Sequence, residues 1–189
     1  MNPQFTRRKL SVLLKKDKSS IGKWDKPILK LCKKINQSKD YYTTSSCSGR
    51  ILLMIDQEKK SKNLFLYSSH KLVTFKEIKH TLENIPKNKN IKFKLDPCII
   101  HLACKDFECA NKLLEIARNT GWKKSGILSY NKSKRIIIEL NGTGKLEFPI
   151  ISKNKILIND KFLKVVVNQS NQKLKHSWKL INNLEKSFS

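Results

Sequence analysis

The sequence predicts an α+β fold, and three observations support this prediction. Segments with helical spacing of apolar residues alternate irregularly with short runs that have the composition of β-strands. Neither G-x-G-x-x-G nor G-x-x-x-x-G-K-[ST] follows a predicted strand, which argues against a Rossmann-type nucleotide fold. No low-complexity segment or obvious linker divides the 189 residues, so we predict a single domain, 1–189.

The first half of the chain is predicted to contain three helices and four strands. Residues 5–16 place apolar side chains at helical spacing, and residues 26–36 do so after Pro27, which suits a first helical turn. A third helix is predicted from Thr74, because Thr74 and Glu77 form the signature of a capping box. The predicted strands of this half are residues 41–46, 50–55, 63–69 and 91–95.

The second half repeats this mixture of elements. Asp106 is expected to cap a helix over residues 107–120, and Gly121 is expected to end it. Residues 159–187 are predicted to form a long C-terminal helix packed on the domain, because their apolar residues form one face. The predicted strands are residues 98–104, 126–130, 135–140 and 146–150. Ser48-Gly49 and Ser125-Gly126 have similar settings, which weakly indicates an internal duplication.

The charge of the chain predicts a polyanionic partner. Forty Lys and Arg residues against fifteen Asp and Glu give a formal net charge of +25. A field of this sign favours nucleic acid, although a membrane surface and a genome that favours lysine codons are alternatives. No apolar run approaches the roughly 18 residues of a membrane span. The N-terminus has no apolar core behind its basic residues, so we expect no secretory signal and a cytosolic location.

The cysteines predict neither a disulfide framework nor a metal site. Their number, five, is odd, and no C-x-x-C is present. The segment "CIIHLACKDFEC" suggests zinc at first sight. However, side chains alternate between the faces of a strand, so Cys98 and Cys104 are expected on one face and His101 on the other. We therefore predict no metal ligand here, and expect the two cysteines to pack as small apolar residues.

The segment "YYTTSSCSGR" is unusual because it combines six small hydroxyl or thiol residues with a glycine and an arginine. We interpret it as a turn whose backbone amides face an anion or ligand, with Gly49 allowing close approach. Arg50 is a rare arginine in a lysine-rich chain, which suggests a need for bidentate donors; an arginine on a solvated strand is the alternative. Cys47 is either a nucleophile with a lowered pKa or a small residue that lines a pocket or packs.

Two carboxylates stand out in "DKSSIGKWD", where acidic residues are otherwise scarce. Asp25 precedes a predicted helix and is either a helix cap or a ligand contact. Asp17 lies inside the loop and is the better candidate for a general base or a ribose contact. Aromatic residues interleave with lysines nearby and suit base stacking, with core packing as the alternative for each ring: Trp24, Tyr41, Tyr42 and Trp122.

These motifs together resemble the tRNA wybutosine-synthesising protein 3 family. The resemblance rests on "DKSSIGKWDKPILKLCKKIN", "DYYTTSSCSGRI", "LFLYSSH", "DPCIIHLACKDFECANKLLEIARNTGWKKSGI" and "KRIIIEL", and it covers nearly the whole chain. It implies duplicated β/α repeats that form a single barrel-like mixed sheet with flanking helices, not a Rossmann methyltransferase. It also implies methylation by S-adenosylmethionine of N4 of the tricyclic wyosine precursor, beside the anticodon of phenylalanine tRNA.

The resemblance gives an expected set of site residues. The proton acceptor is expected to be Asp17 or His70, since one carboxylate or imidazole within hydrogen-bond distance suffices. The expected cofactor contacts are Ser45, Ser46, Ser48, Gly49, Arg50, His101, Ser125 and Gly126. The expected substrate contacts are Ser19, Asp25, Tyr42, Cys47 and Arg135. Ile21, where the family commonly has a basic residue, weakens the idea that the first loop binds phosphate, and Cys98 replaces a larger apolar residue.

Other functions remain open from the sequence. A non-catalytic RNA-binding module would use the same residues to hold an anticodon stem-loop. A regulatory protein would bind the cofactor without RNA, and a thiol enzyme would use Cys47 as its nucleophile. We expect a monomer that binds phenylalanine tRNA through its anticodon loop and does not bind a membrane.

Overall fold

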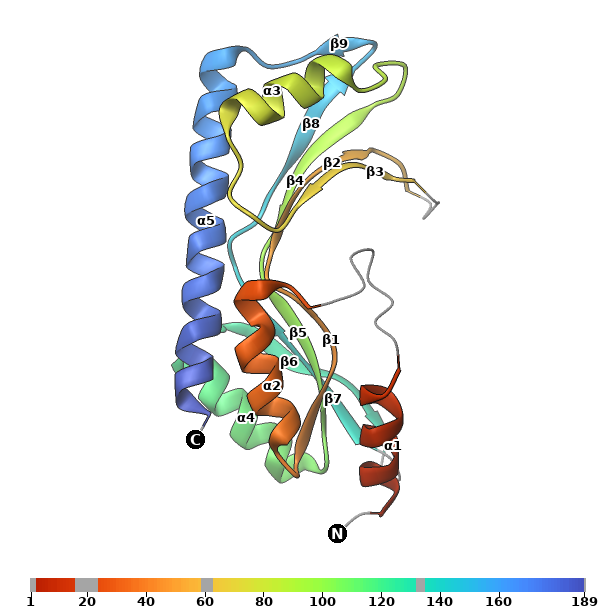
Figure 1. Ribbon diagram of the computed structural model, residues 1–189, viewed down its shortest axis with the longest axis vertical. Coiled ribbons are helices and arrows are strands. Elements are labelled where there is room, and N and C mark those ends of the chain that lie inside the picture. The colour runs from red at the N-terminus through yellow and green to blue at the C-terminus, as the bar shows by residue number, and fades with distance from the viewer. Residues whose placement is uncertain (1–2, 16–23, 59–62, 132–134, 189) are drawn as a thin grey trace. The chain divides into compact units, whose positions relative to one another are not determined.

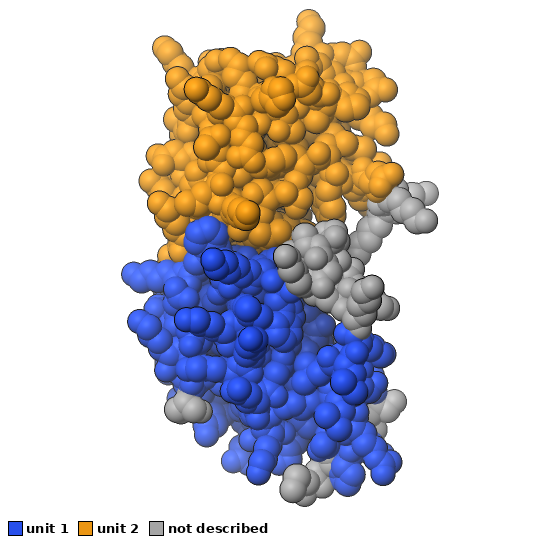
Figure 2. Space-filling view, in the orientation of Figure 1, with its two compact units in different colours: residues 1–48, 98–143, 177–189 blue, residues 49–97, 144–176 orange. Residues whose placement is uncertain are grey.

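The computed structural model of the chain describes residues 3–15, 24–58, 63–131 and 135–188. The chain divides into two compact units (Figure 2). Unit 1 consists of residues 1–48, 98–143 and 177–189, and unit 2 consists of residues 49–97 and 144–176. Among the described helices, none is both long enough and apolar enough to span a bilayer. The predicted single domain stays a prediction.

Unit 1 is a four-stranded antiparallel sheet with helices on both faces. Its strands, in the order β1-β5-β7-β6, are β1 (Tyr41–Cys47), β5 (Ile99–Cys104), β7 (Arg135–Asn141) and β6 (Lys124–Asn131). Its helices are α1 (Pro3–Leu13), the short 3-10 helix η1 (Lys26–Ile28), α2 (Leu29–Gln37), α4 (Phe107–Asn119) and the last part of α5 (Asp160–Ser187). The main core lies between one sheet face and the helices α2, α4 and α5 (Figure 1).

Within the described part of unit 1, helix α1 covers one end of the other face of the sheet. Helix α1 packs Phe5 against Tyr42 and Ala103 at one end of this face. The rings of Phe5 and Tyr42 have centroids 5.2 Å apart, and both residues are buried. Toward the other end, the same face carries polar side chains, which are described below. A sheet with one face packed and one face partly open follows from the alternation of side chains along each strand.

Unit 2 is a five-stranded antiparallel sheet covered by two helices. Its strands, in the order β3-β2-β4-β8-β9, are β3 (Phe65–Ser69), β2 (Arg50–Ile55), β4 (Ile91–Asp96), β8 (Leu146–Ser152) and β9 (Lys155–Ile156). Helix α3 (Phe75–Asn84) and the first part of α5 complete it. Asn171 of α5 both accepts from the Val73 N–H and donates to its carbonyl, which fixes α5 against the segment before α3.

The α+β class, the flanking helices and the departure from a Rossmann arrangement are confirmed, but the sheet differs from the expected one. The strands form two antiparallel sheets, one in each unit, where a single mixed sheet was expected. A single sheet would require strands of the two units to pair with each other, but every described strand pair is antiparallel and lies within one unit. Gly49, with a φ of 98°, separates β1 of one sheet from β2 of the other.

The local start and stop signals acted as predicted. Thr74 and Glu77 form both hydrogen bonds of the capping box at α3. Asp106 accepts from the Cys109 N–H at the start of α4. Gly121 follows the end of α4 with a φ of 100°, a backbone conformation that favours glycine. A Cβ there would also lie 2.8 Å from Leu180 Cδ2 and would displace that methyl group.

The two units resemble each other in content but not in chain order. In unit 1, β5 precedes α4 and the hairpin β6–β7 follows it. In unit 2, the hairpin β2–β3 precedes α3 and β4 follows it. Each unit therefore contains a hairpin and a third strand that is linked to it through a helix. The third strand comes before the helix in unit 1 and after it in unit 2.

Candidate functional site

A row of polar residues crosses three neighbouring strands on the open face of the unit 1 sheet. The strand register places Ser45 of β1 opposite His101 of β5, and His101 opposite Glu139 of β7. Ser45 Oγ lies 2.7 Å from His101 Nδ1, and His101 Nε2 lies 2.7 Å from Glu139 Oε2. Gly126 of β6 continues the row opposite Glu139. We call these four residues the β-sheet row.

The hydrogen bonds of the row fix the imidazole of His101. A carboxylate only accepts, so Nε2 of His101 carries the hydrogen that is donated to Glu139. In the neutral ring, Nδ1 is then an acceptor, and the hydroxyl of Ser45 donates to it. The side chains of His101 and Glu139 are 27% and 31% exposed, and Ser45 is exposed, so the row is open to solvent and to a ligand.

Three of the predicted cofactor contacts therefore lie together, and the sequence missed the fourth member of the row. Ser45, His101 and Gly126 were predicted, but Glu139 was not. A weak signal existed in "RIIIEL", where a carboxylate interrupts an apolar strand of a chain poor in acidic residues. The sequence did not show that Glu139 contacts His101, because no local pattern indicates which strands pair.

The small residues of the "TTSSCS" stretch serve two opposite faces of β1. Thr43, Ser46 and Ser48 turn to the side of the preceding helices. Asn36 donates to Thr43 Oγ1 at 3.0 Å, and Cys32 Sγ lies 3.6 Å from Ser46 Oγ. The small size of Thr43, Ser46 and Ser48 thus has a structural explanation, since small side chains let η1 and α2 approach the strand closely.

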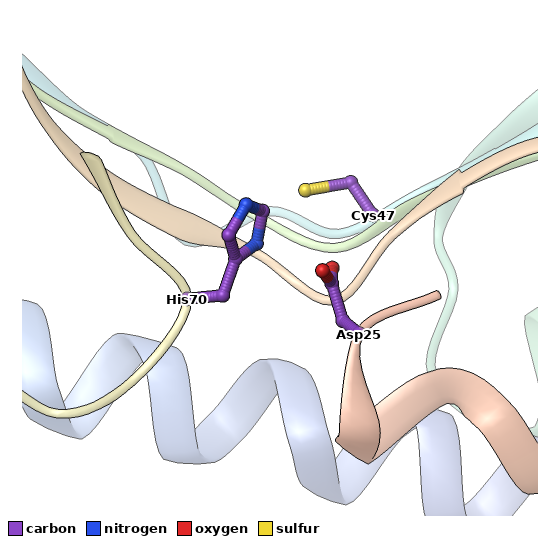
Figure 3. Close-up of side chains that lie close together, drawn as sticks. All are labelled: Asp25, Cys47 and His70. Carbon is purple, nitrogen blue, oxygen red and sulfur yellow. The ribbon is translucent and has the colours of Figure 1, made fainter. Parts of the chain in front are cut away.

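Asp25 is a buried carboxylate bound to the end of β1. It is 8% exposed, and its Oδ2 accepts from the Ser48 N–H at 2.8 Å and from the Ser48 hydroxyl at 3.0 Å. Asp25 does occupy the N-cap position of η1, but its side chain makes no capping hydrogen bond. A carboxylate oxygen of Asp25 lies within 4.8 Å of Cys47 Sγ, and Figure 3 shows both side chains. The capping interpretation is therefore wrong for the side chain.

In unit 2, His70 and Arg50 are held near the start of β2. His70 Nδ1 lies 3.1 Å from the Gly49 carbonyl oxygen. A carbonyl only accepts, so Nδ1 carries the hydrogen of this bond, and Nε2 holds the lone pair of the neutral ring. The ring of His70 is drawn in Figure 3.

Arg50 is oriented by two neighbours. Its Nε donates to Asp96 Oδ2 at 3.2 Å, and its guanidinium carbon lies 5.0 Å from the centre of the Phe65 ring. Its Nη groups make no hydrogen bond within the described part of the chain, and the side chain is 32% exposed. A guanidinium fixed in this way presents two donors to a carboxylate or phosphate.

The remaining predicted residues divide between the surface and the core. Arg135 Nη1 donates to Tyr42 Oη at 2.8 Å, so these two predicted substrate contacts do lie together. However, Tyr42 and Trp122 are fully buried, and core packing is the correct interpretation for these two rings. Ser125 Oγ accepts from the Asn141 N–H, away from the β-sheet row. Asp17 and Ser19 lie outside the described residues.

The cysteines bear out the predicted alternation of faces. Cys98 and Cys104 are buried in the main core of unit 1, while His101 lies in the β-sheet row. Burial raises the pKa of both thiols to about 12, which keeps them protonated and unreactive.

Comparison with known proteins gives consistent matches over most of the chain. A family model described as "Methyltransferase TYW3" matches residues 5–189. A relative from Methanocaldococcus jannaschii is 38% identical over 165 residues, which span 85% of this chain and 83% of the relative. It is named "tRNA(Phe) 7-((3-amino-3-carboxypropyl)-4-demethylwyosine(37)-N(4))-methyltransferase". A second such methyltransferase, from Thermococcus kodakarensis, is 35% identical over 88% of this chain and 78% of its own length.

Solved structures agree with these matches. A protein from Pyrococcus horikoshii has a TM-score of 0.86 and 28% identity, covering 98% of this chain and 94% of that one. A protein from Aeropyrum pernix has a TM-score of 0.74 and 26% identity, covering 87% of this chain and 96% of that one. The fold described above is therefore shared with proteins of similar length.

Proposed function

The chain belongs to the TYW3 methyltransferase family, and on that premise we propose that it methylates N4 of the tricyclic wyosine precursor in phenylalanine tRNA. The methyl donor we propose is S-adenosylmethionine. The observation that carries this proposal is the family match over residues 5–189, which includes every residue that the sequence predicted for the site. The expectations of a cytosolic location and a monomeric state stay predictions.

The open face of the unit 1 sheet suits the donor. A Cβ built at Gly126 would meet nothing within 4 Å, so a ligand can approach the backbone there. Ser45, His101 and Gly126 lie in one row and would contact the donor directly. Ser46, Ser48 and Ser125 would support this surface from behind, because their hydroxyls bond to the protein itself. When bound, the donor supplies an electrophilic methyl group on a sulfonium.

The protein's chemical task is to align the two reactants and to accept one proton. We assign proton acceptance to the imidazole of His70, whose Nδ1 lies 3.1 Å from the Gly49 carbonyl oxygen. Asp17 remains the alternative acceptor predicted from the sequence. Arg50 would bind a carboxylate or phosphate through its Nη groups, with Asp96 and Phe65 holding the guanidinium plane.

The remaining predicted contacts have more limited roles in this proposal. Asp25 would act through Ser48, whose position it fixes, and Gly49 through the turn that its positive φ permits. Cys47 would line the substrate side as a small residue. Arg135 would contact RNA, because Tyr42 holds it at the edge of the same sheet face.

Transfer of a labelled methyl group tests the function. Purified protein, tritiated S-adenosylmethionine and phenylalanine tRNA that carries the unmethylated tricyclic base are expected to give up to one labelled methyl group per tRNA. The matched control is the same tRNA with guanosine in place of the tricyclic base, and we expect no label there. Binding of both tRNAs with transfer to neither would leave only an RNA-binding module.

Binding of the tRNA is expected to depend strongly on salt. The chain carries a net charge of +25, and lysines that contact phosphates release counterions on binding. If about five phosphates are neutralised, the logarithm of affinity should fall against the logarithm of salt concentration with a slope of about −3.5 to −4.5. Fluorescence anisotropy of labelled tRNA over a salt series measures this slope. A slope near zero would exclude docking by the lysines.

A further inference from the structure

The β-sheet row offers hydrogen-bond acceptors to a ligand and has few donors left. His101 has both ring nitrogens engaged, one with Ser45 and one with Glu139. In the neutral state of the ring, the proton of Ser45 points to His101, which leaves the lone pairs of Ser45 Oγ for another donor. With a neutral His101, the row therefore accepts hydrogen bonds from a ligand and does not donate them.

Glu139 is the strongest acceptor of the row. Its Oε2 accepts from His101 at 2.7 Å, and its Oε1 accepts from Asn141 Nδ2 at 3.3 Å. A carboxylate has about four acceptor sites, so both oxygens keep capacity for further donors. The side chain is 31% exposed, and no lysine or arginine forms an ion pair with it in the described part of the chain. In a chain with a net charge of +25, such a carboxylate is unusual.

Space for a ligand lies directly beside this carboxylate. Gly126 is the register partner of Glu139 on the neighbouring strand β6. Any other residue would place a side chain there, whereas a Cβ at Gly126 would touch nothing within 4 Å. Gly126 does not have a positive φ, so its backbone conformation does not require glycine. An open space beside an exposed acceptor is the arrangement that a ligand contact needs.

The chemistry of the row selects the class of ligand. A phosphate brings only acceptors and negative charge, and a carboxylate would repel it. A pair of vicinal hydroxyls brings two donors, and an acidic side chain is a common partner of ribose hydroxyls in nucleotide-binding proteins. We propose that Glu139 accepts hydrogen bonds from the ribose hydroxyls of the methyl donor's nucleoside. This inference rests on the proposed function and adds to it a specificity residue.

The test is a binding cycle with two ligands and two proteins. The ligands are S-adenosylhomocysteine and its 2′,3′-dideoxy analogue, and the proteins are the full chain and its Glu139→Gln variant. The unaltered protein should bind S-adenosylhomocysteine about 10- to 100-fold more tightly than the analogue, because hydrogen bonds to a charged group are lost. In Glu139→Gln this preference should become much smaller, because only neutral hydrogen bonds remain possible, with binding of the analogue unchanged. Isothermal titration calorimetry measures all four affinities.

Two controls separate recognition from folding. The glutamine can still accept from His101 Nε2 through its amide oxygen, so the row should keep its geometry. Glu115→Gln removes an exposed carboxylate from α4 of the same unit, and we expect it to bind both ligands as the unaltered protein does. Gly126→Val should block S-adenosylhomocysteine without loss of thermal stability, because the added side chain enters only the ligand space.

The outcomes are distinct. Equal weakening of both ligands in Glu139→Gln, or an unchanged preference, would overturn the inference while the function stands. Loss of tRNA affinity with unchanged S-adenosylhomocysteine affinity would mean that the row receives a ribose of the RNA instead, which also overturns it. If the unaltered protein binds neither ligand, the proposed donor itself is wrong.

Discussion

Replacing His70 with glutamine is expected to slow methyl transfer by about 100- to 10,000-fold, the usual contribution of a general base. Nδ1 of His70 lies 3.1 Å from the Gly49 carbonyl oxygen, which positions the imidazole. Glutamine can keep a hydrogen bond to that carbonyl through its amide N–H, but it cannot take up a proton. Affinities for S-adenosylhomocysteine and for tRNA should therefore stay unchanged.

The measurement is a single-turnover rate of methyl transfer with both substrates saturating, so that the chemical step is compared without differences in binding. His80→Gln is the matched control, since His80 is on helix α3 and contacts Asn84 of the same helix. If His70→Gln transfers the methyl group at the rate of the control, Asp17 becomes the leading candidate for the acceptor.

Replacing Asp25 with alanine is expected to lower the free energy of unfolding by about 2–4 kcal/mol. Ser48 is fully buried, and both its N–H and its hydroxyl donate to Asp25 Oδ2. Alanine would leave two buried donors without this acceptor, and each costs about 1–3 kcal/mol. Asparagine keeps an oxygen in place, so we expect Asp25→Asn to cost clearly less, about 1 kcal/mol.

Urea unfolding of the full chain, followed by circular dichroism, gives these values. Glu115→Ala is the control, because it removes an exposed carboxylate without a buried partner and should change stability by less than about 0.5 kcal/mol. An Asp25→Ala variant as stable as this control would show that the carboxylate does not hold Ser48. A variant that is destabilised but still methylates would limit Asp25 to a structural role.

The sequence predicted the local architecture well because local architecture depends on neighbouring residues. Thr74 and Glu77, three positions apart, make the capping box at α3 that their spacing indicated. The C-terminal helix was predicted over residues 159–187 and observed over Asp160–Ser187. The short strand β9 was missed, since Lys155–Ile156 is too short to show a pattern.

The candidate site was predicted only in part. The alternation along one strand correctly separated His101 from Cys98 and Cys104. It did not show that Ser45 shares a face with His101, while Ser46 and Ser48 turn toward the preceding helices. Asp25 illustrates the same limit, since its position suggested a cap, but its side chain binds Ser48 instead.

By itself, the sequence determined the element types, their ends, the excess of positive charge and the family resemblance. These depend on residues within a few positions of each other or on composition. Only the tertiary structure decided which strands pair, and hence that the strands form two antiparallel sheets and that Glu139 completes a row with Ser45 and His101. The bonds of this row join residues 56 and 38 positions apart. Their formation depends on the packing of whole sheets and helices, because strand register follows from the burial of entire faces and not from any adjacent residues.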